Sequence, residues 1–285
     1  TYNRKEKLIR LIKSILKSNY PRNKLEIIVI DDASTDGTYE EVKKRFPEVK
    51  IIRNKKEKLV TACRNIGIRK SKGSYIFFID DDNIVDKNCI SLLVKAMKTN
   101  PKFGLVGPVS IYNSKKNVIW CAGAIFNIIF GVHLHIKYNK PLKLLRNVKK
   151  IYCDYIPNAY MTRKEILKKI NYFDQKKFPI AMEEIDLAYR IRHLCYKIAV
   201  IPESIVFHDV PLKRDFHITP LRAYFRGRSR VLFYKKYLKY RIIGIFFDIL
   251  AFLFLIIKYS EKNKRKIFIE YLKGVFNGIA SPVYN

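Results

Sequence analysis

Hydrophobic residues in the first part of the chain alternate between helical spacing and short apolar runs. Over residues 4–19, apolar side chains recur at helical spacing between Lys and Arg, which predicts an amphipathic helix ended by Pro21. Three short apolar runs predict strands, at residues 25–30, 49–53 and 75–79. Two further helices are predicted between them, one ending near Phe46 and one over residues 57–71. Strands that alternate with helices form βαβ units, so we expect an α/β, Rossmann-like fold with a mostly parallel sheet and flanking helices.

The pattern becomes less regular from about residue 103. Irregular apolar segments lead into a basic connector over residues 137–150. Two helices and two short strands are then predicted, at residues 163–170, 184–194, 197–201 and 205–207. We therefore expect a second half, residues 109–210, built onto a first half, residues 1–108.

The last quarter, residues 211–285, differs from the rest. Residues 242–257 are apolar apart from Gly244 and Asp248. Sixteen helical residues reach about 24 Å, short of the ~30 Å hydrocarbon core of a membrane, and a central Asp adds a further cost. We therefore expect an interfacial or re-entrant segment, followed by a basic amphipathic helix at 262–276, and not a simple spanning helix. The alternative is a soluble core helix followed by a solvated basic one.

The charge of the chain limits the partners that it is expected to bind. The 285 residues carry 57 Lys and Arg against 25 Asp and Glu, a formal net charge of +32. This balance favours an acidic partner, which is nucleic acid, an anionic lipid surface or a phosphate-bearing substrate. The hydrophobic content of 48% is sufficient for one large core and excludes a disordered tail.

The cysteines indicate a reducing environment. Five are widely spaced, with no C-x-x-C pair and no His at zinc-ligand spacing: Cys63, Cys89, Cys121, Cys153 and Cys195. We interpret them as reduced core residues. Scattered unpaired thiols fit poorly in an oxidising compartment, which favours a cytosolic location.

Acidic residues directly follow two predicted strands: Asp31 and Asp32, and then Asp80, Asp81 and Asp82. Parallel strands bring their carboxyl ends to one edge of a sheet, so we expect both groups in one cleft. The crowded triplet needs a neutralising cation, and Mg²⁺ or Mn²⁺ binds carboxylate oxygens together with substrate phosphates. The first group could hold a nucleoside by hydrogen bonds. The alternatives are a solvated turn or helix cap for the triplet and an ordinary Asx turn for the first group.

A third acidic group, Glu183, Glu184 and Asp186, begins a predicted helix. Acids at this spacing can face one cleft, and one of them could accept the proton of an attacking hydroxyl. The alternative is a favourable placement of acids in the first turn of a helix. His208 ends the strand 205–207 and could bind a metal, although a lone His is more often structural.

Taken in chain order, these segments resemble the family 2 glycosyltransferases of GT-A fold. Five pieces carry the resemblance: TYNR at 1–4, IIVIDDASTDGT at 27–38, RNIGIRKSKGSYIFFIDDDN at 64–83, NAYMTRKEILKKINYFD at 158–174 and EEIDLAYRIRHLCYKIAVIPESIVFH at 183–208. The stretch YFRGRSRVLFYKKY at 224–237 is similar to members that add sugars to lipid-linked or cell-surface glycans, including rhamnosyltransferase-like ones. The resemblance implies a nucleotide-binding half at 1–108 and an acceptor half at 109–210.

The resemblance also implies roles for the matching residues. Those expected at the nucleotide sugar are Thr1, Asn3, Asp31, Asp32, Arg64, Asp80 and Asp81. Asp82 matches the metal-binding acid of the D-x-D motif, and His208 matches a histidine near the metal and the diphosphate. Glu184 stands where the family usually has the Asp of an "ED" pair, the general base, so Glu183 and Asp186 stay open as alternatives. The family's first strand normally precedes T-Y-N-R and is absent from this sequence, so we expect a central position of the sheet to be empty.

The implied reaction is direct displacement with inversion. A hydroxyl of a lipid-linked or other glycan acceptor, including a polyprenyl-phosphate-linked one, attacks the anomeric carbon of a UDP-, dTDP- or GDP-linked sugar. Mn²⁺ or Mg²⁺ is the expected cofactor. The basic region 211–285 is expected to hold the enzyme against anionic lipid at the cytoplasmic face of the cell membrane, without binding nucleic acid.

Three other functions compete with this interpretation. A nucleic-acid-binding protein would show salt-sensitive binding and would not need the acidic groups. A dinucleotide-dependent oxidoreductase would need a G-x-G-x-x-G segment after a strand, and the sequence has none. An inactive glycosyltransferase-like protein would bind the nucleotide sugar without turning it over.

Overall fold

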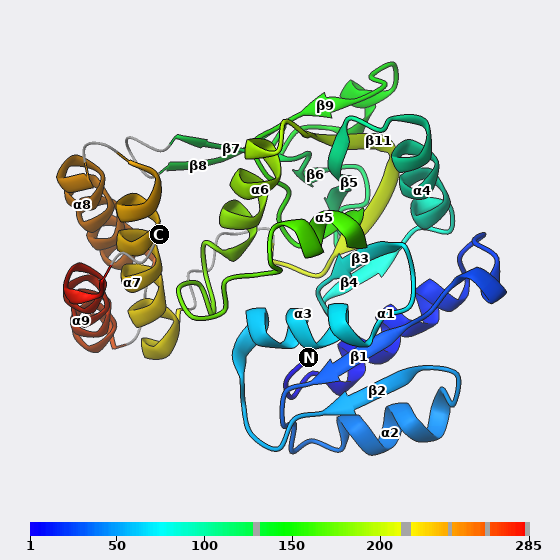
Figure 1. Cartoon of the computed structure of the whole chain (residues 1–285), viewed down its shortest axis with the longest axis horizontal. Helices are drawn as coiled ribbons and strands as arrows, with labels where there is room; N and C mark the ends of the chain where they lie inside the picture. Colours follow the sequence, from blue (N-terminus) through cyan, green and yellow to red (C-terminus); the bar gives the residue numbers. More distant parts are fainter. Residues whose placement is uncertain (128–131, 212–217, 239–240, 260–262, 283–285) are drawn as a thin grey trace.

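The computed structural model describes residues 1–127, 132–211, 218–238, 241–259 and 263–282 (Figure 1). Its larger part is a mixed α/β body, and the last part of the chain forms a group of helices at one side of that body. The candidate site lies on the side of the body that faces these helices.

The N-terminal segment forms the predicted βαβ unit. Its elements are α1 (Lys5–Leu16), β1 (Ile28–Asp31), α2 (Thr38–Arg45), β2 (Lys50–Arg53) and α3 (Leu59–Lys70). β1 and β2 pair in parallel. All five elements are confirmed, because the apolar periodicity of the sequence corresponds to buried faces such as the one that α1 turns toward β1 and α2.

The main sheet follows the N-terminal unit. It contains β3 (Tyr75–Ile79), β4 (Asn83–Val85), β5 (Phe103–Tyr112), β6 (Ile119–Cys121), β9 (Ile151–Tyr152), β10 (Ala159–Arg163) and β11 (Lys197–His208). The order along its main path is β3-β10-β5-β11-β4. β3, β5 and β11 run in one direction, because β5 pairs in parallel with β11 and β10 lies antiparallel between β3 and β5. The predicted α/β fold with flanking helices is confirmed, and the structure adds the antiparallel strands β4, β6, β9 and β10.

β5 is the long strand that the irregular pattern after residue 103 did not predict. All ten of its residues are buried, so the polar and apolar alternation typical of a half-exposed strand is missing. Its glycines permit close packing: a Cβ atom on Gly104 would lie 2.4 Å from Cγ2 of Ile191. β11 also differs from the prediction, since the two expected short strands form one strand with a register shift between Ile201 and Ile205.

Helices and a hairpin complete the body. The helices are α4 (Cys89–Thr99), α5 (Lys164–Lys169) and α6 (Glu183–His193), and the hairpin pairs β7 (Ala124–Asn127) with β8 (Val132–His135). The predicted helices at 163–170 and 184–194 are confirmed, whereas α4 was not predicted. All five cysteines are free thiols, but the interpretation of them as core residues is wrong for Cys195, which is exposed.

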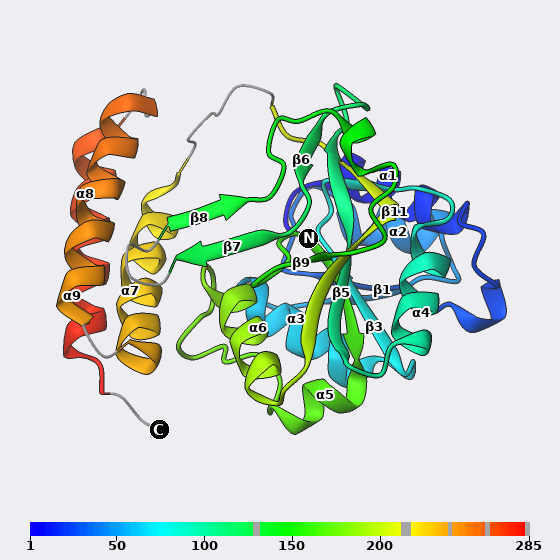
Figure 2. The same cartoon turned by 90° about the horizontal axis from the view of Figure 1, so that it is seen from above.

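The last part of the chain forms α7 (Pro220–Tyr237), α8 (Arg241–Tyr259) and α9 (Lys264–Ala280), which lie side by side (Figures 1 and 2). Figure 2 shows the β7–β8 hairpin extending from the body toward α7. The rings of Phe126 on β7 and Phe233 on α7 lie 5.5 Å apart and join the two parts. Within the described residues, no helix combines the length and the apolarity that crossing a membrane requires.

Asp248 shows how α8 is oriented. Its carboxylate is 2% exposed, accepts a hydrogen bond from Tyr271 Oη at 2.6 Å and forms an ion pair with Arg230. The central acid of the apolar run therefore faces α7 and α9 and is neutralised there. The opposite face of α8 is apolar and exposed, with Ile242 83% and Phe254 58% accessible.

We predict that Gly274→Ala will separate α7 from α9. A Cβ atom on Gly274 would lie 1.9 Å from the carbonyl oxygen of Tyr224, so the two backbones must move apart. The expected cost is about 3 kcal/mol or more, at the upper end for overpacking. Gly244→Ala on α8 is the matched control, since its nearest neighbour is 3.4 Å away, and it should stabilise by ~0.5–1 kcal/mol. Thermal unfolding of both variants is the measurement, and equal melting temperatures would contradict the close crossing.

Candidate active site

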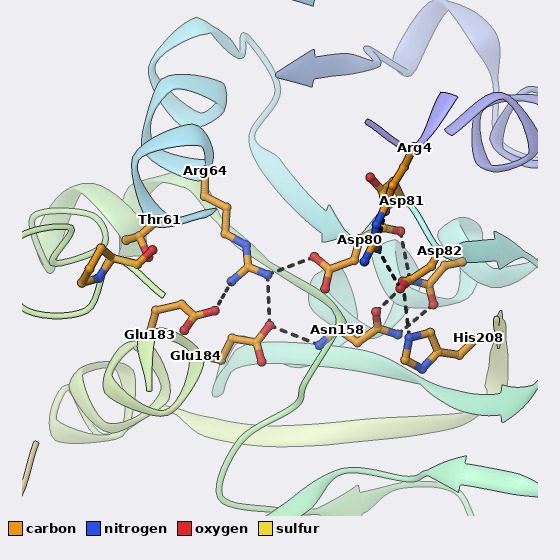
Figure 3. Close-up of polar contacts among 12 residues, drawn as sticks. Arg4, Thr61, Arg64, Asp80, Asp81, Asp82, Asn158, Glu183, Glu184 and His208 are labelled. Carbon is orange, nitrogen blue, oxygen red and sulfur yellow. Dashed lines mark hydrogen bonds and ion pairs between the residues drawn. The ribbon is translucent and has the colours of Figure 1, made fainter. Parts of the chain in front are cut away.

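The candidate active site forms where β3 and β11 end and α6 begins (Figure 3). Asp80, Asp81 and Asp82 follow β3, and Glu183 and Glu184 open α6. β11 pairs with β4 so that its last residue stands opposite Asn83. This register brings the end of β11 beside the acidic triplet, although the two segments are far apart in the sequence.

Arg64 is the centre of the first group of contacts. Its guanidinium donates to Glu183 Oε1 at 3.2 Å, to Glu184 Oε1 at 3.1 Å and to Asp80 Oδ1 at 3.1 Å. The side chain is 10% exposed and lies over the ring of Tyr160 at 5.7 Å. A single cation thus holds three carboxylates from two segments at one point, an arrangement that the sequence did not predict.

Burial sets the protonation of the two glutamates. It raises the pKa of Glu184 to about 8, and although Arg64 lowers the value, Glu183 and Asp80 raise it again. Burial likewise raises the pKa of Glu183. A carboxyl group whose pKa is close to neutral pH can accept a proton and release it again, which is the property that a general base requires.

Asp82 and His208 form the second group of contacts. His208 Nε2 lies 3.3 Å from Asp82 Oδ1, and Arg4 donates to Asp82 Oδ2 at 3.1 Å and to Asp81 Oδ1 at 3.0 Å. Burial raises the pKa of Asp82, but the hydrogen bond to His208 and the charges of Arg4 and Lys7 lower it below its usual range. Asp82 therefore carries its negative charge at neutral pH.

Two asparagines connect the groups, and one of them, Asn158, lies beside Glu184 in Figure 3. The amides of Asn83 and Asn158 donate to each other at 2.7 Å, and the backbone N–H of Asn158 donates to Glu184 Oε1 at 3.2 Å. Asn158 has a left-handed backbone with φ of 74°. The glutamates and Asp82 are thus held in one hydrogen-bonded frame that crosses the end of the sheet.

A cavity of about 230 Å³ opens beside the glutamates. It is lined by His133, Tyr155, Pro157, Ala181, Met182, Glu183, Glu184, Ile185, Arg226 and Arg230. The two arginines come from α7, so the C-terminal helices complete the wall of the cavity. A hydroxyl group bound in this cavity would have access to the glutamate carboxylates.

The first predicted acidic group has local partners. Asp31 is buried and accepts from the N–H of Ser34 at 3.0 Å. Asp32 accepts from Asn54 Nδ2 at 2.8 Å and from the backbone N–H groups of Lys58 and Leu59 at 2.9 Å, at the start of α3. The contact of Asp31 with Ser34 is of the kind that the Asx-turn alternative describes, and the nucleotide-binding role of both residues stays a prediction.

The N-terminal residues are joined to the same loop. The amino group of Thr1 donates to the carbonyl of Ile30 at 2.9 Å, and the N–H of Asp32 donates to the carbonyl of Thr1 at 2.9 Å. Asn3 Oδ1 accepts from the N–H of Thr35 at 2.8 Å. Both residues therefore support the Asp31–Asp32 loop, and their expected contact with a nucleotide sugar also stays a prediction.

Asp186 lies apart from Glu183 and Glu184. Its carboxylate is fully buried and pairs with Arg190 at 2.7 Å, with Lys236 at 2.8 Å and with Tyr237 Oη at 2.8 Å. Through Lys236 and Tyr237, Asp186 joins α6 to α7. The structure therefore does not support Asp186 as a base, because its side chain points to a helix interface and not into the cavity.

Sequence reasoning missed several members of the site. Arg4 lies in the TYNR segment and Asn158 begins the NAYMTR segment, but neither was assigned a role there. Arg226 and Arg230 are one helical turn apart on α7, a spacing that could have indicated a shared face. Their position beside the glutamates depends on long-range packing, which no local pattern predicts.

The residues present fit a divalent cation at Asp82 and His208. The guanidinium of Arg4 already stands as a cation between Asp81 and Asp82, so the carboxylates form a site for positive charge. Among the residues that the structure describes, no group of three or more His, Cys, Asp and Glu side chains is arranged to hold a metal. Mg²⁺ and similar ions need only one or two protein carboxylates when substrate phosphates supply other oxygens.

Comparison with known proteins gives the family context. The model of the family "Glycosyl transferase family 2" matches residues 1–170. The "Probable glycosyltransferase YdaM" of Bacillus subtilis (strain 168) is 25% identical over 263 residues, which cover 89% of this chain and 60% of YdaM. The chain covers still less of two other bacterial relatives, 35% and 14% of their lengths.

Solved structures share the fold. GalNAc-T7 with UDP, GalNAc and Mn²⁺ has a TM-score of 0.66 at 18% identity, over 93% of this chain and 51% of that one. Mannosyltransferase PcManGT from Pyrobaculum calidifontis, in complex with GDP-Man and Mn²⁺, has a TM-score of 0.60 at 15% identity, over 98% of this chain and 85% of that one. Both neighbours bind nucleotides or nucleotide sugars.

Proposed function

Because this chain belongs to glycosyl transferase family 2, we propose that it transfers a sugar from a nucleoside diphosphate to a hydroxyl group of a lipid-linked or cell-surface glycan acceptor. The observation that carries the proposal is the position of Glu183 and Glu184, which face a cavity on one side and Arg64 on the other. The frame through Asn158 and Asn83 links these glutamates to Asp82. An acceptor site and a diphosphate site would then lie next to each other.

The proposed reaction is a displacement with inversion at the anomeric carbon. The acceptor oxygen forms the new bond to that carbon, the bond to the diphosphate oxygen breaks, and Glu184 takes the hydroxyl proton. Glu184 is preferred as the base because it combines a pKa of about 8 with a place in the cavity lining. Arg64 holds the carboxylate in position, and the nucleoside diphosphate leaves on the side of Asp82.

Asp82 and His208 would hold a divalent cation, Mn²⁺ or Mg²⁺, together with oxygens of the diphosphate. Such a cation would stabilise the negative charge of the leaving group. Two structural neighbours were solved with Mn²⁺, which supports this part of the proposal. Arg4 would give up its contact with Asp82 in that state and could donate to the diphosphate instead.

The proposal is tested by titrating UDP, dTDP, GDP and their sugar derivatives into the full chain, with and without Mn²⁺. One nucleotide is expected to bind, and more tightly with Mn²⁺. Binding of none of them, in a chain that unfolds cooperatively, would contradict the function.

We also propose that α8 places the enzyme on an anionic membrane surface at the cytoplasmic face. Its outward apolar stripe consists of Ile242, Phe246, Leu250, Phe254 and Ile257, which are 46% to 83% exposed. Exposed basic residues begin α9 next to the end of this stripe, where Lys264 Nζ donates to the carbonyl of Ile257 at 3.1 Å. An apolar stripe bordered by cations is typical of interfacial helices.

The double variant Phe246→Ser, Phe254→Ser should lose vesicle binding. Removing two large apolar contacts is expected to weaken binding to phosphatidylglycerol vesicles by about tenfold or more. Leu144→Ser, another exposed apolar residue, is the control and should have no effect. Co-sedimentation measures the vesicle binding, and added salt should weaken that binding. Equal binding by the wild type and the double variant would exclude α8 as the contact surface.

A further inference from the structure

The cavity beside the glutamates has one wall from α6 and one from α7. One wall carries Glu183 and Glu184 of α6, and the other carries Arg226 and Arg230 of α7. The arginines are four residues apart, so they occupy the same face of the helix. The cavity is therefore lined both by carboxyl groups and by a pair of guanidinium donors.

Several bonds fix α7 relative to α6. Arg228 donates to the carbonyl of Lys177 at 3.1 Å, and Ser229 Oγ donates to that of Ile180 at 3.2 Å, both in the loop before α6. Asp186 of α6 binds Lys236 and Tyr237 of α7. The arginine pair consequently has a defined position relative to the glutamates, as a binding subsite requires.

The charge of the arginine wall is maintained inside the protein. Burial and the neighbouring Arg230 lower the pKa of Arg226 to about 10, which leaves it charged at neutral pH. Arg230 is held by its ion pair with Asp248. His133 shares this wall, and burial, followed by Arg230 and Arg226, lowers its pKa well below the usual value. His133 is therefore neutral and is paired with Tyr155 Oη at 2.8 Å.

We infer that the acceptor carries a phosphate group, which Arg226 and Arg230 bind while its hydroxyl meets Glu184. This inference rests on the proposed glycosyl transfer. Each guanidinium presents a planar fork of donors, and a phosphate offers more acceptor oxygens than a carboxylate, so two forks on one helix face match a phosphate better. A cavity of about 230 Å³ is smaller than the ~300–1,000 Å³ of sites for whole drug-sized ligands. It suits the reacting end of a larger acceptor.

The test compares two probes that differ in the group on the anomeric oxygen, which is a phosphate in one and a methyl group in the other. N-acetylglucosamine 1-phosphate and methyl N-acetylglucosaminide are titrated into the full chain that is saturated with Mn²⁺ and with the nucleoside diphosphate that binds. The phosphate probe should bind the wild type at least about tenfold more tightly, and Arg226→Gln should remove that preference, a loss of about 10–100-fold for a hydrogen bond between charged groups. Arg226→Lys, which keeps the charge, should retain part of the preference for the phosphate probe.

Arg222→Gln is the matched control, because it removes the same charge from an exposed position of α7. It should keep the preference for the phosphate probe. Nucleotide titration of every variant shows that the protein is folded and that the donor site is intact. If nucleotide binds but both probes bind equally, or Arg226→Gln keeps the preference, the phosphate subsite is wrong and the glycosyltransferase proposal stands. If no nucleotide binds to the wild type, the proposed function itself fails.

Two arms complete the experiment. If the phosphate probe binds the nucleotide-free chain but not the saturated one, the nucleoside diphosphate occupies the arginine pair, which then belongs to the donor site, and the inference is overturned. A probe with a short prenyl chain on the phosphate distinguishes the sources of an acceptor phosphate. Tighter binding of this probe supports a lipid-linked acceptor, whereas unchanged binding supports a phosphate within a soluble or polymeric one.

Discussion

Glu184→Gln is expected to lower turnover by about 10²–10⁴-fold, the usual contribution of a general base. Nucleotide affinity should be unchanged, because the amide keeps the size of the side chain and Arg64 still has Glu183 and Asp80 as partners. Steady-state rates and nucleotide titration on the same preparation separate the two effects. Glu203→Gln on an exposed position of β11 is the control and should keep full activity.

The pH dependence of the wild type gives a second measure of the same group. The base acts only when Glu184 is deprotonated, and its pKa is raised to about 8. The rate should therefore rise with pH through neutrality and level off above about pH 8. A group whose pKa is raised on folding binds its proton more tightly in the folded state. The contribution of Glu184 to the free energy of unfolding should thus fall as the pH rises over the same interval. A pH-independent rate, or full activity of Glu184→Gln, would exclude Glu184 as the base.

Asp82→Asn should remove the effect of Mn²⁺ on nucleotide binding. The variant loses the charged oxygen that faces His208 and Arg4, so we expect a fall in Mn²⁺-dependent affinity of at least about 10–100-fold, which is the loss typical of residues that only orient a metal ligand. Turnover should fall with it, because the leaving diphosphate loses its counter-charge. Isothermal titration with and without Mn²⁺ is the measurement.

Asp209→Asn is the matched control for the metal site. Asp209 adjoins His208, and its carboxylate pairs with Arg10 at 2.8 Å and with Lys7 at 3.5 Å. The substitution removes the same charge from the same region without touching Asp82. Retained Mn²⁺ dependence in Asp209→Asn and its loss in Asp82→Asn would support the assignment. If both variants keep the dependence, the cation site is elsewhere.

Local patterns predicted the elements of residues 1–79 well, because most of them have a buried face with the periodicity of a helix or strand. β5 was missed for a physical reason, since a strand buried on both faces has no alternation to detect. Antiparallel β10 was missed as well, because its place between β3 and β5 depends on pairing between segments about 80 and 55 residues apart. Strand order is a property of the whole chain.

The same distinction applies to the candidate site. The sequence placed Asp80 to Asp82, Glu183, Glu184 and His208 at the ends of elements, and the structure brings them together. The sequence could not show which carboxylates bind other groups of the protein and so stabilise the fold. Asp32 and Asp186 follow the same local pattern as their neighbours, yet backbone N–H groups bind the first and three side chains from α6 and α7 bind the second.

The buried acids Asp186 and Asp248 have a joint mechanical consequence. Asp186 fastens the helix that carries Glu184 to α7, and Asp248 fastens α7 to α8 and α9. Each link is an ion pair to a buried carboxylate, and breaking such a pair is costly. α7 therefore keeps a fixed position between α6 on one side and α8 and α9 on the other. If α8 rests on a bilayer, the height and tilt of the glutamates above the lipid headgroups are set by the protein, and only hydroxyl groups presented at that height can react.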